Sequence, residues 1–205
     1  MKTIITINRE FSSGGREVAK RVADELGFHY YDDELISAIA KDGNLSEEFV
    51  KNQSEVPLSV DFPFVFGRTV IGSLYMQPLN LEVQIAQSNL IKEIGDRGNA
   101  VIVGRLANDI IEAEKTLDIF IYSSDMEKRV NRYLQREEKK DVTEKEIKKI
   151  ISKVDKERSK YYEQNTCNKW KNMNNYALCI DTSIIEIKQA AKIIASALKT
   201  INNQK

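Results

Sequence analysis

Short apolar runs alternate along this chain with stretches in which apolar residues recur every three to four positions. The runs lie at Ile4–Ile7, Phe28–Tyr31, Ala100–Val103, Leu117–Tyr122 and Tyr176–Ile180. Continuous runs rich in β-branched and aromatic residues are typical of strands buried on both faces of a parallel sheet. Five such strands, each followed by a helical pattern, predict a three-layer α/β/α fold around a five-stranded parallel sheet.

Capping signals bound several of the helical stretches. The first helix is expected after Gly15 and ends at Gly27, where glycine can close it in a left-handed conformation. A Ser123-Ser124-Asp125 run precedes another helix, and Thr143 with Glu146 has the pattern of a capping box. Further helical patterns cover residues 35–40, 44–50, 81–95 and 184–198.

The segment from Ser54 to Asn80 has no regular period, although it is rich in apolar side chains. Prolines and glycines interrupt it, and aromatic residues lie between Phe62 and Tyr75. A long loop inside a compact domain is usually functional or mobile. Because so many aromatic side chains would not remain in water, we expect them either to cover a pocket or to form the interface of a homodimer.

The turn between the first strand and the first helix is polar and contains two glycines. It consists of Ser12, Ser13, Gly14, Gly15, Arg16 and Glu17. A strand, a glycine turn and a helix N-terminus direct several backbone N–H groups to one point, which attracts phosphate. The motif GxxxxGK[ST] is not satisfied, because anchoring it on Gly15 puts Arg16 at its lysine and Glu17 at its Ser/Thr position. Arg16 favours a phosphate loop, since a guanidinium binds phosphate through a fork of donors, and an ordinary strand-to-helix turn is the alternative.

Polar residues also follow other predicted strands. Asp32 and Asp33 come after the second strand, Gly104 and Arg105 after the third, and Asp181 ends the fifth. In an open parallel sheet, ligands bind beyond the carboxyl ends of the strands, so these residues and Arg16 predict a phosphate-handling rim. Two simpler interpretations stay open: an N-cap at Asp32 or Asp33, and a surface salt bridge at Arg105.

Arginines accumulate on the helix that follows the fourth strand. Arg129, Arg132 and Arg136 have spacings that keep them near one face. They form either a solvated face paired with neighbouring glutamates or a cationic lid over phosphates.

Composition and charge narrow the function classes. The 205 residues fit one domain, and 31 basic residues balance 31 acidic ones. A zero net charge argues against a nucleic-acid partner, because such partners leave a basic imprint. No apolar run has the length of a signal peptide or a membrane span, so we expect a cytoplasmic protein with no membrane partner. The single histidine and the spacing of Cys167 and Cys179 predict no metal site of the zinc type.

With these motifs described, the chain resembles the cytidylate kinase-like family of bacterial proteins, within the P-loop nucleoside monophosphate kinases. The resemblance is near full length and is carried by six stretches, and the GGRE form of the loop is typical of this family. These are residues 4–17, Tyr31-Asp32, Val101–Arg105, the arginine-bearing helix after Phe120-Ile121, Asp155–Arg158 with Tyr161-Tyr162, and Asp181–Ser183.

The resemblance implies an enzyme that transfers the γ-phosphoryl group of ATP to CMP or dCMP with Mg²⁺. It implies that Ser12 to Glu17 hold the ATP phosphates and that Asp32 and Arg105 face the acceptor. The catalytic residues implied are Arg16 and the lid arginines Arg129, Arg132 and Arg158. The implied single P-loop kinase-like domain has a core (1–41, 91–128 and 172–205), an acceptor-binding insertion (42–90) and a lid (129–171).

One departure from the resemblance leaves the acceptor open. Authentic cytidylate kinases carry an Arg-Asp pair after the third strand, whereas this chain has Arg105-Leu106. The first hypothesis is therefore a phosphotransferase acting on CMP, dCMP or another small acceptor that bears a phosphate or hydroxyl group. The second is a nucleotide-binding regulatory protein that kept the fold and lost the chemistry.

Overall fold

In a computed structural model of the chain, residues 2–32, 81–137 and 142–204 are described. Asp33, the helical patterns at 35–40 and 44–50, the aromatic segment and most of the predicted insertion lie outside the described residues. Among the described residues, no helix is both long and apolar enough to cross a membrane.

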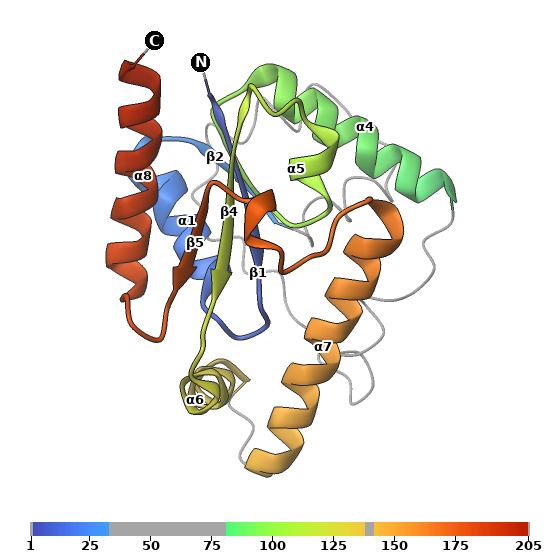
Figure 1. Cartoon of the computed structure of the whole chain (residues 1–205), viewed down its shortest axis with the longest axis vertical. Coiled ribbons are helices and arrows are strands. Elements are labelled where there is room, and N and C mark those ends of the chain that lie inside the picture. Colours follow the sequence, from blue (N-terminus) through green and yellow to red (C-terminus); the bar gives the residue numbers. More distant parts are fainter. Residues whose placement is uncertain (1, 33–80, 138–141, 205) are drawn as a thin grey trace.

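A parallel sheet forms the centre of the molecule, as the alternation of strands and helices predicted. The strands run in the order β2-β3-β1-β4-β5, and every neighbouring pair is parallel. Their bounds are β1 Ile4–Arg9, β2 His29–Tyr31, β3 Ala100–Val103, β4 Thr116–Tyr122 and β5 Leu178–Asp181. Because the strands are parallel, all carboxyl ends meet at one edge, toward the bottom of Figure 1.

Two helices cover one face of the sheet. Helix α1 (Gly15–Leu26) packs beside α8 (Ile187–Asn203), and Val18, Val22 and Ile194 bury their side chains against the strands. Gly27 caps α1 at φ 66°, in the left-handed conformation that the sequence predicted. Helix α8 begins three residues later than Ile184, whose side chain is exposed.

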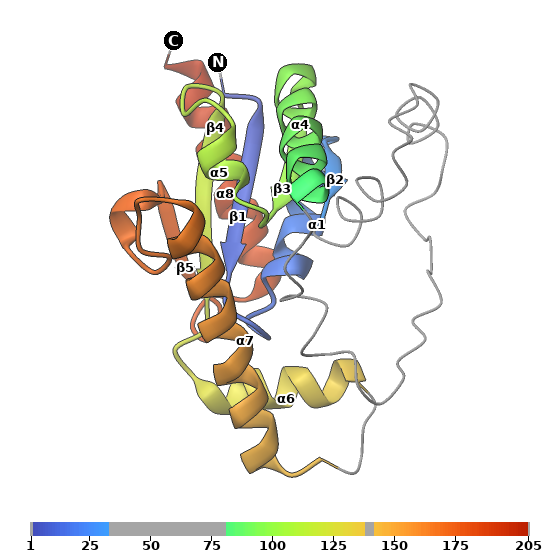
Figure 2. The ribbon, with the colours of Figure 1, turned by 90° about the vertical axis from the view of Figure 1, so that its right-hand side faces the viewer.

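The other face carries α4 (Leu81–Arg97), the short α5 (Ala107–Ile110) and the C-terminal half of α7 (Glu144–Asn165) (Figures 1 and 2). Helix α4 continues through Gly95, where an added Cβ would lie only 3.1–3.2 Å from the side chain of Ile111. Sequence patterns missed α5 and the 3-10 turn at Met173–Asn175, because elements of three or four residues show no periodicity.

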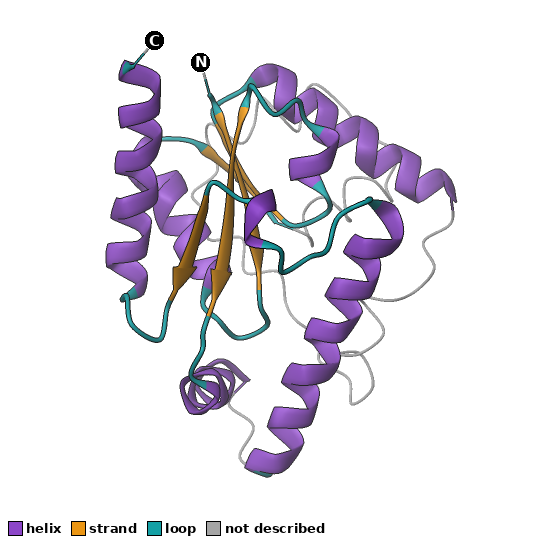
Figure 3. Cartoon of the chain, in the orientation of Figure 1, coloured by secondary structure: helices purple, strands orange, loops and turns teal. Residues whose placement is uncertain are grey.

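Helix α6 (Met126–Glu137) lies beyond the carboxyl ends of the strands, and the N-terminal half of α7 projects past them (Figure 3). Asp125 Oδ1 accepts hydrogen bonds from the backbone N–H groups of Glu127 and Lys128, so it caps α6 as predicted. The predicted capping box of α7 is present between Thr143 and Glu146. The two helices therefore bring their side chains to the edge where the strands end.

Both α4 and α6 cross limits of the predicted subdivision of the chain. Helix α4 runs unbroken through the limit at residues 90 and 91, and α6 runs through the limit at 128 and 129. The division into core, insertion and lid stays a prediction.

Asp118 supplies a pH-dependent test of the fold. Burial raises the pKa of this carboxyl above its ordinary value of 3.8, although hydrogen bonds from Thr6 and Thr116 and the charge of Lys2 oppose the shift. A raised carboxyl pKa destabilises the folded state as pH rises from 3.8 through the folded pKa. Asp118→Asn, whose amide can exchange hydrogen bonds with both hydroxyls, is expected to raise the melting temperature at pH 7.

The gain should shrink as the pH is lowered toward 3.8, because the folded wild-type carboxyl then takes up its proton and burial no longer penalises a charge. Thermal melts of the two proteins between pH 3.5 and 7.5 measure the difference. A melting temperature that is lower for the variant at every pH would contradict the argument.

Candidate active site

The turn after β1 forms a tight loop at the foot of α1. Ser12 lies at φ 59° and Gly14, the N-cap of α1, at φ 82°, so two residues adopt the left-handed conformation within three positions. Within the described residues, no side chain caps the N-terminus of α1. Since the first N–H groups of a helix have no partner within the helix, this end of α1 can bind an anion.

Gly15 is the first residue of α1 and is packed too closely to carry a side chain. A Cβ atom there would lie 2.5 Å from Arg9 Cβ and 3.3 Å from Ile121 Cβ. The chain therefore enters the helix in direct contact with β1 and β4. A side chain at position 15 would not fit in the present backbone, and Arg16, at the lysine position of the motif, is the first cationic side chain of the helix.

Arg16 projects toward the second strand. Its Nε lies 3.7 Å from Asp32 Oδ2, so the structure joins two of the predicted site residues. Glu17 points along α1 instead and pairs with Arg21 at 3.2 Å, with both side chains about half exposed. The carboxylate of Glu17 thus forms its ion pair with a residue one turn further along the helix.

The two serine hydroxyls of the loop are bound to backbone carbonyls. Ser12 Oγ donates to Arg129 O at 2.8 Å, and Ser13 Oγ, which is fully buried, donates to Glu10 O at 2.9 Å. In this arrangement neither hydroxyl fits as a magnesium ligand. The described residues also contain no group of three or more His, Cys, Asp or Glu that could hold a metal ion.

Arg129 is buried, with a side chain only 5% exposed, and lies between two carboxylates. Its Nη1 is 3.2 Å from Glu10 Oε2, and its Nη2 is 2.5 Å from Asp155 Oδ2. Its Nε and Nη2 also donate to Phe11 O at 2.9 and 2.6 Å. Arg129 is therefore part of the interior that joins α6 and α7 to the loop.

The other two predicted lid arginines also donate to carbonyls of the loop. Arg132 Nη1 donates to Ser12 O at 3.3 Å, and its guanidinium lies against Gly14. Arg158 Nη1 donates to Arg9 O at 3.0 Å, and its guanidinium stands over the Phe11 ring at 5.6 Å. Burial lowers the pKa of Arg132 below its ordinary value, although the charge of Glu17 opposes this shift.

Glu10 and Lys171 belong to the same group of residues, and sequence reasoning missed both. The Glu10 carboxylate is buried, accepts a hydrogen bond from Ser123 N at 3.2 Å, and forms an ion pair with Lys171. Nothing in the sequence links Lys171 to position 10, because they lie 161 residues apart. The position of Glu10 directly after a buried strand was the one available signal.

The end of β3 has unusual backbone geometry. Gly104, Arg105 and Leu106 all have positive φ values, of 77°, 54° and 60°. Such conformations in non-glycine residues are strained and cluster at functional sites. The sharp turn places Arg105 between β3 and α5, at the edge where the strands end, as predicted.

A polar chain crosses the sheet surface beneath this turn. Asn8 donates to Asn108 Oδ1 at 2.9 Å, and Asn108 in turn donates to the hydroxyl of Tyr162 at 2.9 Å. Burial raises the pKa of Tyr162, so this phenol stays protonated at neutral pH. The chain connects β1, α5 and α7 below the candidate site.

The residue after β5 contacts the loop on the side of α8. Thr182 Oγ1 donates to Ser13 O at 2.6 Å. Burial acts to raise the pKa of Asp181, but hydrogen bonds from Ser124 and Ser183 outweigh it and hold the pKa below its ordinary value. Asp181 thus remains ionised and joins the β4–α6 and β5–α8 connections.

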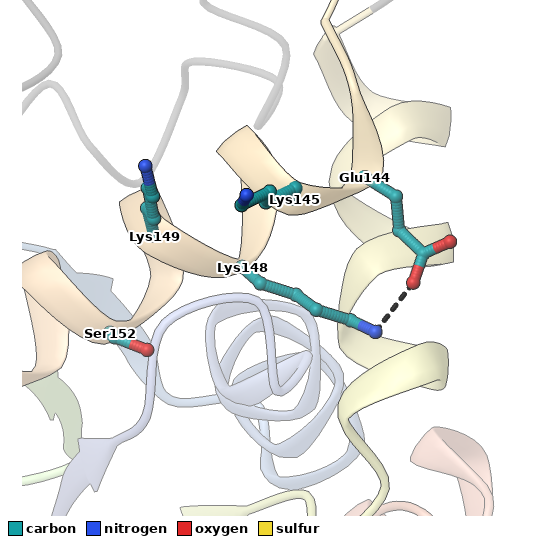
Figure 4. Close-up of a pocket in the computed structure, with 5 residues that line it drawn as sticks. All are labelled: Glu144, Lys145, Lys148, Lys149 and Ser152. Carbon is teal, nitrogen blue, oxygen red and sulfur yellow. Dashed lines mark ion pairs between the residues drawn. The ribbon is translucent and has the colours of Figure 1, made fainter.

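An open hollow of ≈ 730 Å³ lies along the first turns of α7, lined by Glu144, Lys145, Lys148, Lys149 and Ser152 (Figure 4). Lys148 is engaged there, with its Nζ 2.5 Å from Glu144 Oε1 and 2.6 Å from Glu127 Oε1. No residue of the loop lines this hollow, and we place the candidate site at the loop.

A comparison of sequences identifies the family of this chain. The pattern of the cytidylate kinase-like family matches residues 4–184. The chain belongs to this family. No curated protein matches the chain.

Several solved structures share the fold of this chain. An uncharacterized protein from Eubacterium ventriosum ATCC 27560 has a TM-score of 0.71 and 26% identity, with 97% of this chain and 99% of that one covered. A shikimate kinase from Bacteroides thetaiotaomicron has a TM-score of 0.52 and 12% identity, with 98% of each chain covered. TT1252 from Thermus thermophilus has a TM-score of 0.53 and 16% identity, again with 98% of each covered.

Family and fold together support a phosphotransferase of the nucleotide kinase type. The P-loop kinase fold that the family resemblance implied is confirmed. Cytidylate kinase-like proteins of this fold generally use ATP and Mg²⁺. Which acceptor the chain uses, and which residues contact it, are matters for proposal.

Proposed function

We propose that this cytidylate kinase-like protein transfers the γ-phosphoryl group of ATP to CMP, dCMP or another small acceptor. The observation that carries the proposal is the convergence of cations on an uncapped helix N-terminus. Arg132 lies against Gly14, and Arg16 extends from the first turn of α1. Both could donate to phosphate oxygens held above the loop.

This arrangement meets the main demand of phosphoryl transfer, which is positioning and neutralisation of charge. The N–H groups at the start of α1 would orient the phosphates, and Arg132 would neutralise charge that develops during transfer. Arg132 is half-buried and hydrogen-bonded to Ser12 O, so its guanidinium is already ordered beside the loop. Little reorganisation would be needed when nucleotide binds.

The acceptor would lie on the side of β2 and β3. The family resemblance implies that Asp32, at the end of β2, and Arg105, after β3, face the acceptor. Arg105 would bind the acceptor phosphate through its planar fork of donors. Leu106 stands where cytidylate kinases have a carboxylate, which supports a broader choice of acceptor than CMP.

The loop fits a nucleotide triphosphate better than it fits a protein-held metal. Its helix N-terminus and arginines suit phosphate, whereas the hydroxyls of Ser12 and Ser13 are committed to carbonyls. Mg²⁺ commonly binds through substrate phosphates and water, with few protein ligands. A bound Mg²⁺ would therefore take its ligands from the substrate phosphates and water.

The test is ADP release from Mg-ATP in the presence of a panel of nucleoside monophosphates. Arg132→Ala is expected to lower kcat by about 100-fold, the usual cost of losing one preorganised donor to the transition state. Arg105→Ala should raise the KM of the acceptor and leave the KM of ATP nearly unchanged. Arg136→Ala, on the exposed last turn of α6, is the matched control and should retain wild-type rates.

A second candidate function is nucleotide binding without catalysis. It is favoured by the absence of a lysine from the loop and by the pairing of Arg16 with Asp32 at 3.7 Å. Calorimetric binding of ATP without ADP release for any acceptor would support this regulatory function. Turnover that persists unchanged in Arg132→Ala would remove the proposed role of that arginine.

A further inference from the structure

The backbone N–H and the backbone carbonyl of Phe11 are both held by one ion pair. Its N–H donates to Asp155 Oδ1 at 2.7 Å, and its carbonyl accepts from Arg129 Nε at 2.9 Å and Nη2 at 2.6 Å. Asp155 Oδ2 and Arg129 Nη2 are themselves 2.5 Å apart. The four groups close a ring that contains the backbone of Phe11.

This ring is sheltered and is supported from both sides. The side chains of Arg129 and Asp155 are 5% and 11% exposed. Glu10, which precedes Phe11, holds Arg129 Nη1 at 3.2 Å, and Ser12, which follows it, donates its hydroxyl to Arg129 O at 2.8 Å. Three consecutive loop residues are therefore fixed to one arginine.

The direction of these bonds matters for anion binding. A loop binds phosphate when its N–H groups point inward and its carbonyls point away from the ligand. Arginines of α6 and α7 donate hydrogen bonds to the carbonyls of Arg9, Phe11 and Ser12, and so hold these carbonyls away from the ligand. In this loop, which has no lysine, side chains from outside the loop hold its carbonyls.

We propose that Arg129 and Asp155 are positioning residues that set the conformation of the phosphate loop, and that they do so without touching the nucleotide. The inference deepens the proposed function and rests on it for the identity of the ligand. It also assigns Arg129 a task different from the direct contact with the transferring group that the resemblance implied. Arg132 keeps the direct contact, because it lies against Gly14.

Two conservative variants test the proposal. Arg129→Lys keeps the charge but offers a single ammonium group, which cannot reach Phe11 O, Glu10 and Asp155 in the same geometry. Asp155→Asn keeps an acceptor for Phe11 N–H and removes the charge that orients Arg129. Each is expected to raise the KM of ATP about tenfold, the effect of losing one charged hydrogen bond, with the acceptor KM within twofold.

A readout without nucleotide separates this proposal from the proposed function. Hydrogen exchange of loop amides 10–15 should become about tenfold faster in both variants, because a hydrogen bond to a charged group is weakened. Leu198→Ala, a core change in α8 away from the ring, is the control for general destabilisation and should leave loop exchange unchanged at a temperature well below its Tm.

Each outcome has one meaning. Faster loop exchange together with a raised ATP KM supports the positioning role. If loop amides exchange faster in the variants but the protein binds no nucleotide, the result would support the positioning role of Arg129 and Asp155 and overturn the proposed function. Unchanged loop exchange in both folded variants, or a change equal to that of Leu198→Ala, would overturn the positioning role whatever the activity.

Discussion

Replacing Gly15 with alanine is expected to remove most nucleotide affinity and phosphotransfer, although alanine is the better helix former. Position 15 is not in the left-handed region, so backbone strain gives no reason for glycine there. The reason is space: an added Cβ would lie 2.5 Å from Arg9 Cβ and 3.3 Å from Ile121 Cβ. Both atoms are attached directly to the backbone of the central strands, so they cannot rotate away.

The helix N-terminus must therefore move away from the strands. Overpacking of this kind costs about 1–3 kcal/mol in unfolding free energy. A displacement near 1 Å at a site that positions phosphates can cost about 100-fold in turnover. The measurements are the urea midpoint and the kcat/KM of ATP for Gly15→Ala.

Gly27→Ala provides the matched control at the opposite end of the same helix. No heavy atom lies within 4 Å of the added Cβ, but φ is +66°, so this change tests strain without crowding. It should cost about 1–2 kcal/mol of stability, with kcat/KM unchanged. Equal effects of the two variants on kcat/KM would contradict the proposal that the tight entry into α1 positions the loop.

Local patterns predicted most of the fold because the relevant interactions are local. β3 was placed at Ala100–Val103, its observed bounds, since a four-residue run of buried apolar side chains has sharp limits. The cap at Gly27 and the capping box at Thr143 depend on residues within a few positions of each other. The alternation of strands and helices predicted a parallel sheet, but the order of its strands was not predicted and comes from the structure.

The candidate site was predicted less completely, because its contacts join distant parts of the chain. The sequence put Arg16, Arg105 and Asp32 at one edge, and the structure pairs Arg16 with Asp32. It could not show that Arg129 faces inward, since helical spacing gives a face but not what covers it. The pairing of Arg129 with Glu10 spans 119 residues and that of Glu10 with Lys171 spans 161.

The three arginines of α6 differ in burial, so they cannot all have the same role. Arg129, Arg132 and Arg136 have similar positions on a helical pattern, yet they are buried, half-buried and exposed in that order. The two interpretations of the cluster, a solvated face or a cationic lid, therefore do not apply to all three alike. Only Arg132 combines contact with the loop and partial exposure.

Removing the buried guanidinium with Arg129→Ala is expected to cost about 3–5 kcal/mol of unfolding free energy, because it leaves buried carboxylates without their partner. Glu10 keeps Lys171 and the backbone N–H of Ser123. Among the described residues, the hydrogen bonds to Asp155 come from Phe11 N and Arg129, so Asp155 loses its compensating charge. Urea denaturation at constant m-value measures the loss.

The double variant Arg129→Ala/Asp155→Asn distinguishes a buried charge from lost packing. Neutralising Asp155 in the alanine background should restore about 1–2 kcal/mol, since the amide still accepts from Phe11 N–H and no unpaired charge remains. In the wild-type background the same Asp155→Asn change should be destabilising, so the two changes are strongly non-additive. Arg21→Ala, which breaks an exposed pair with Glu17, should cost less than about 0.5 kcal/mol. If the costs of the two single variants simply add, Arg129 and Asp155 act independently, and the buried ion pair does not hold α6 and α7 to the loop.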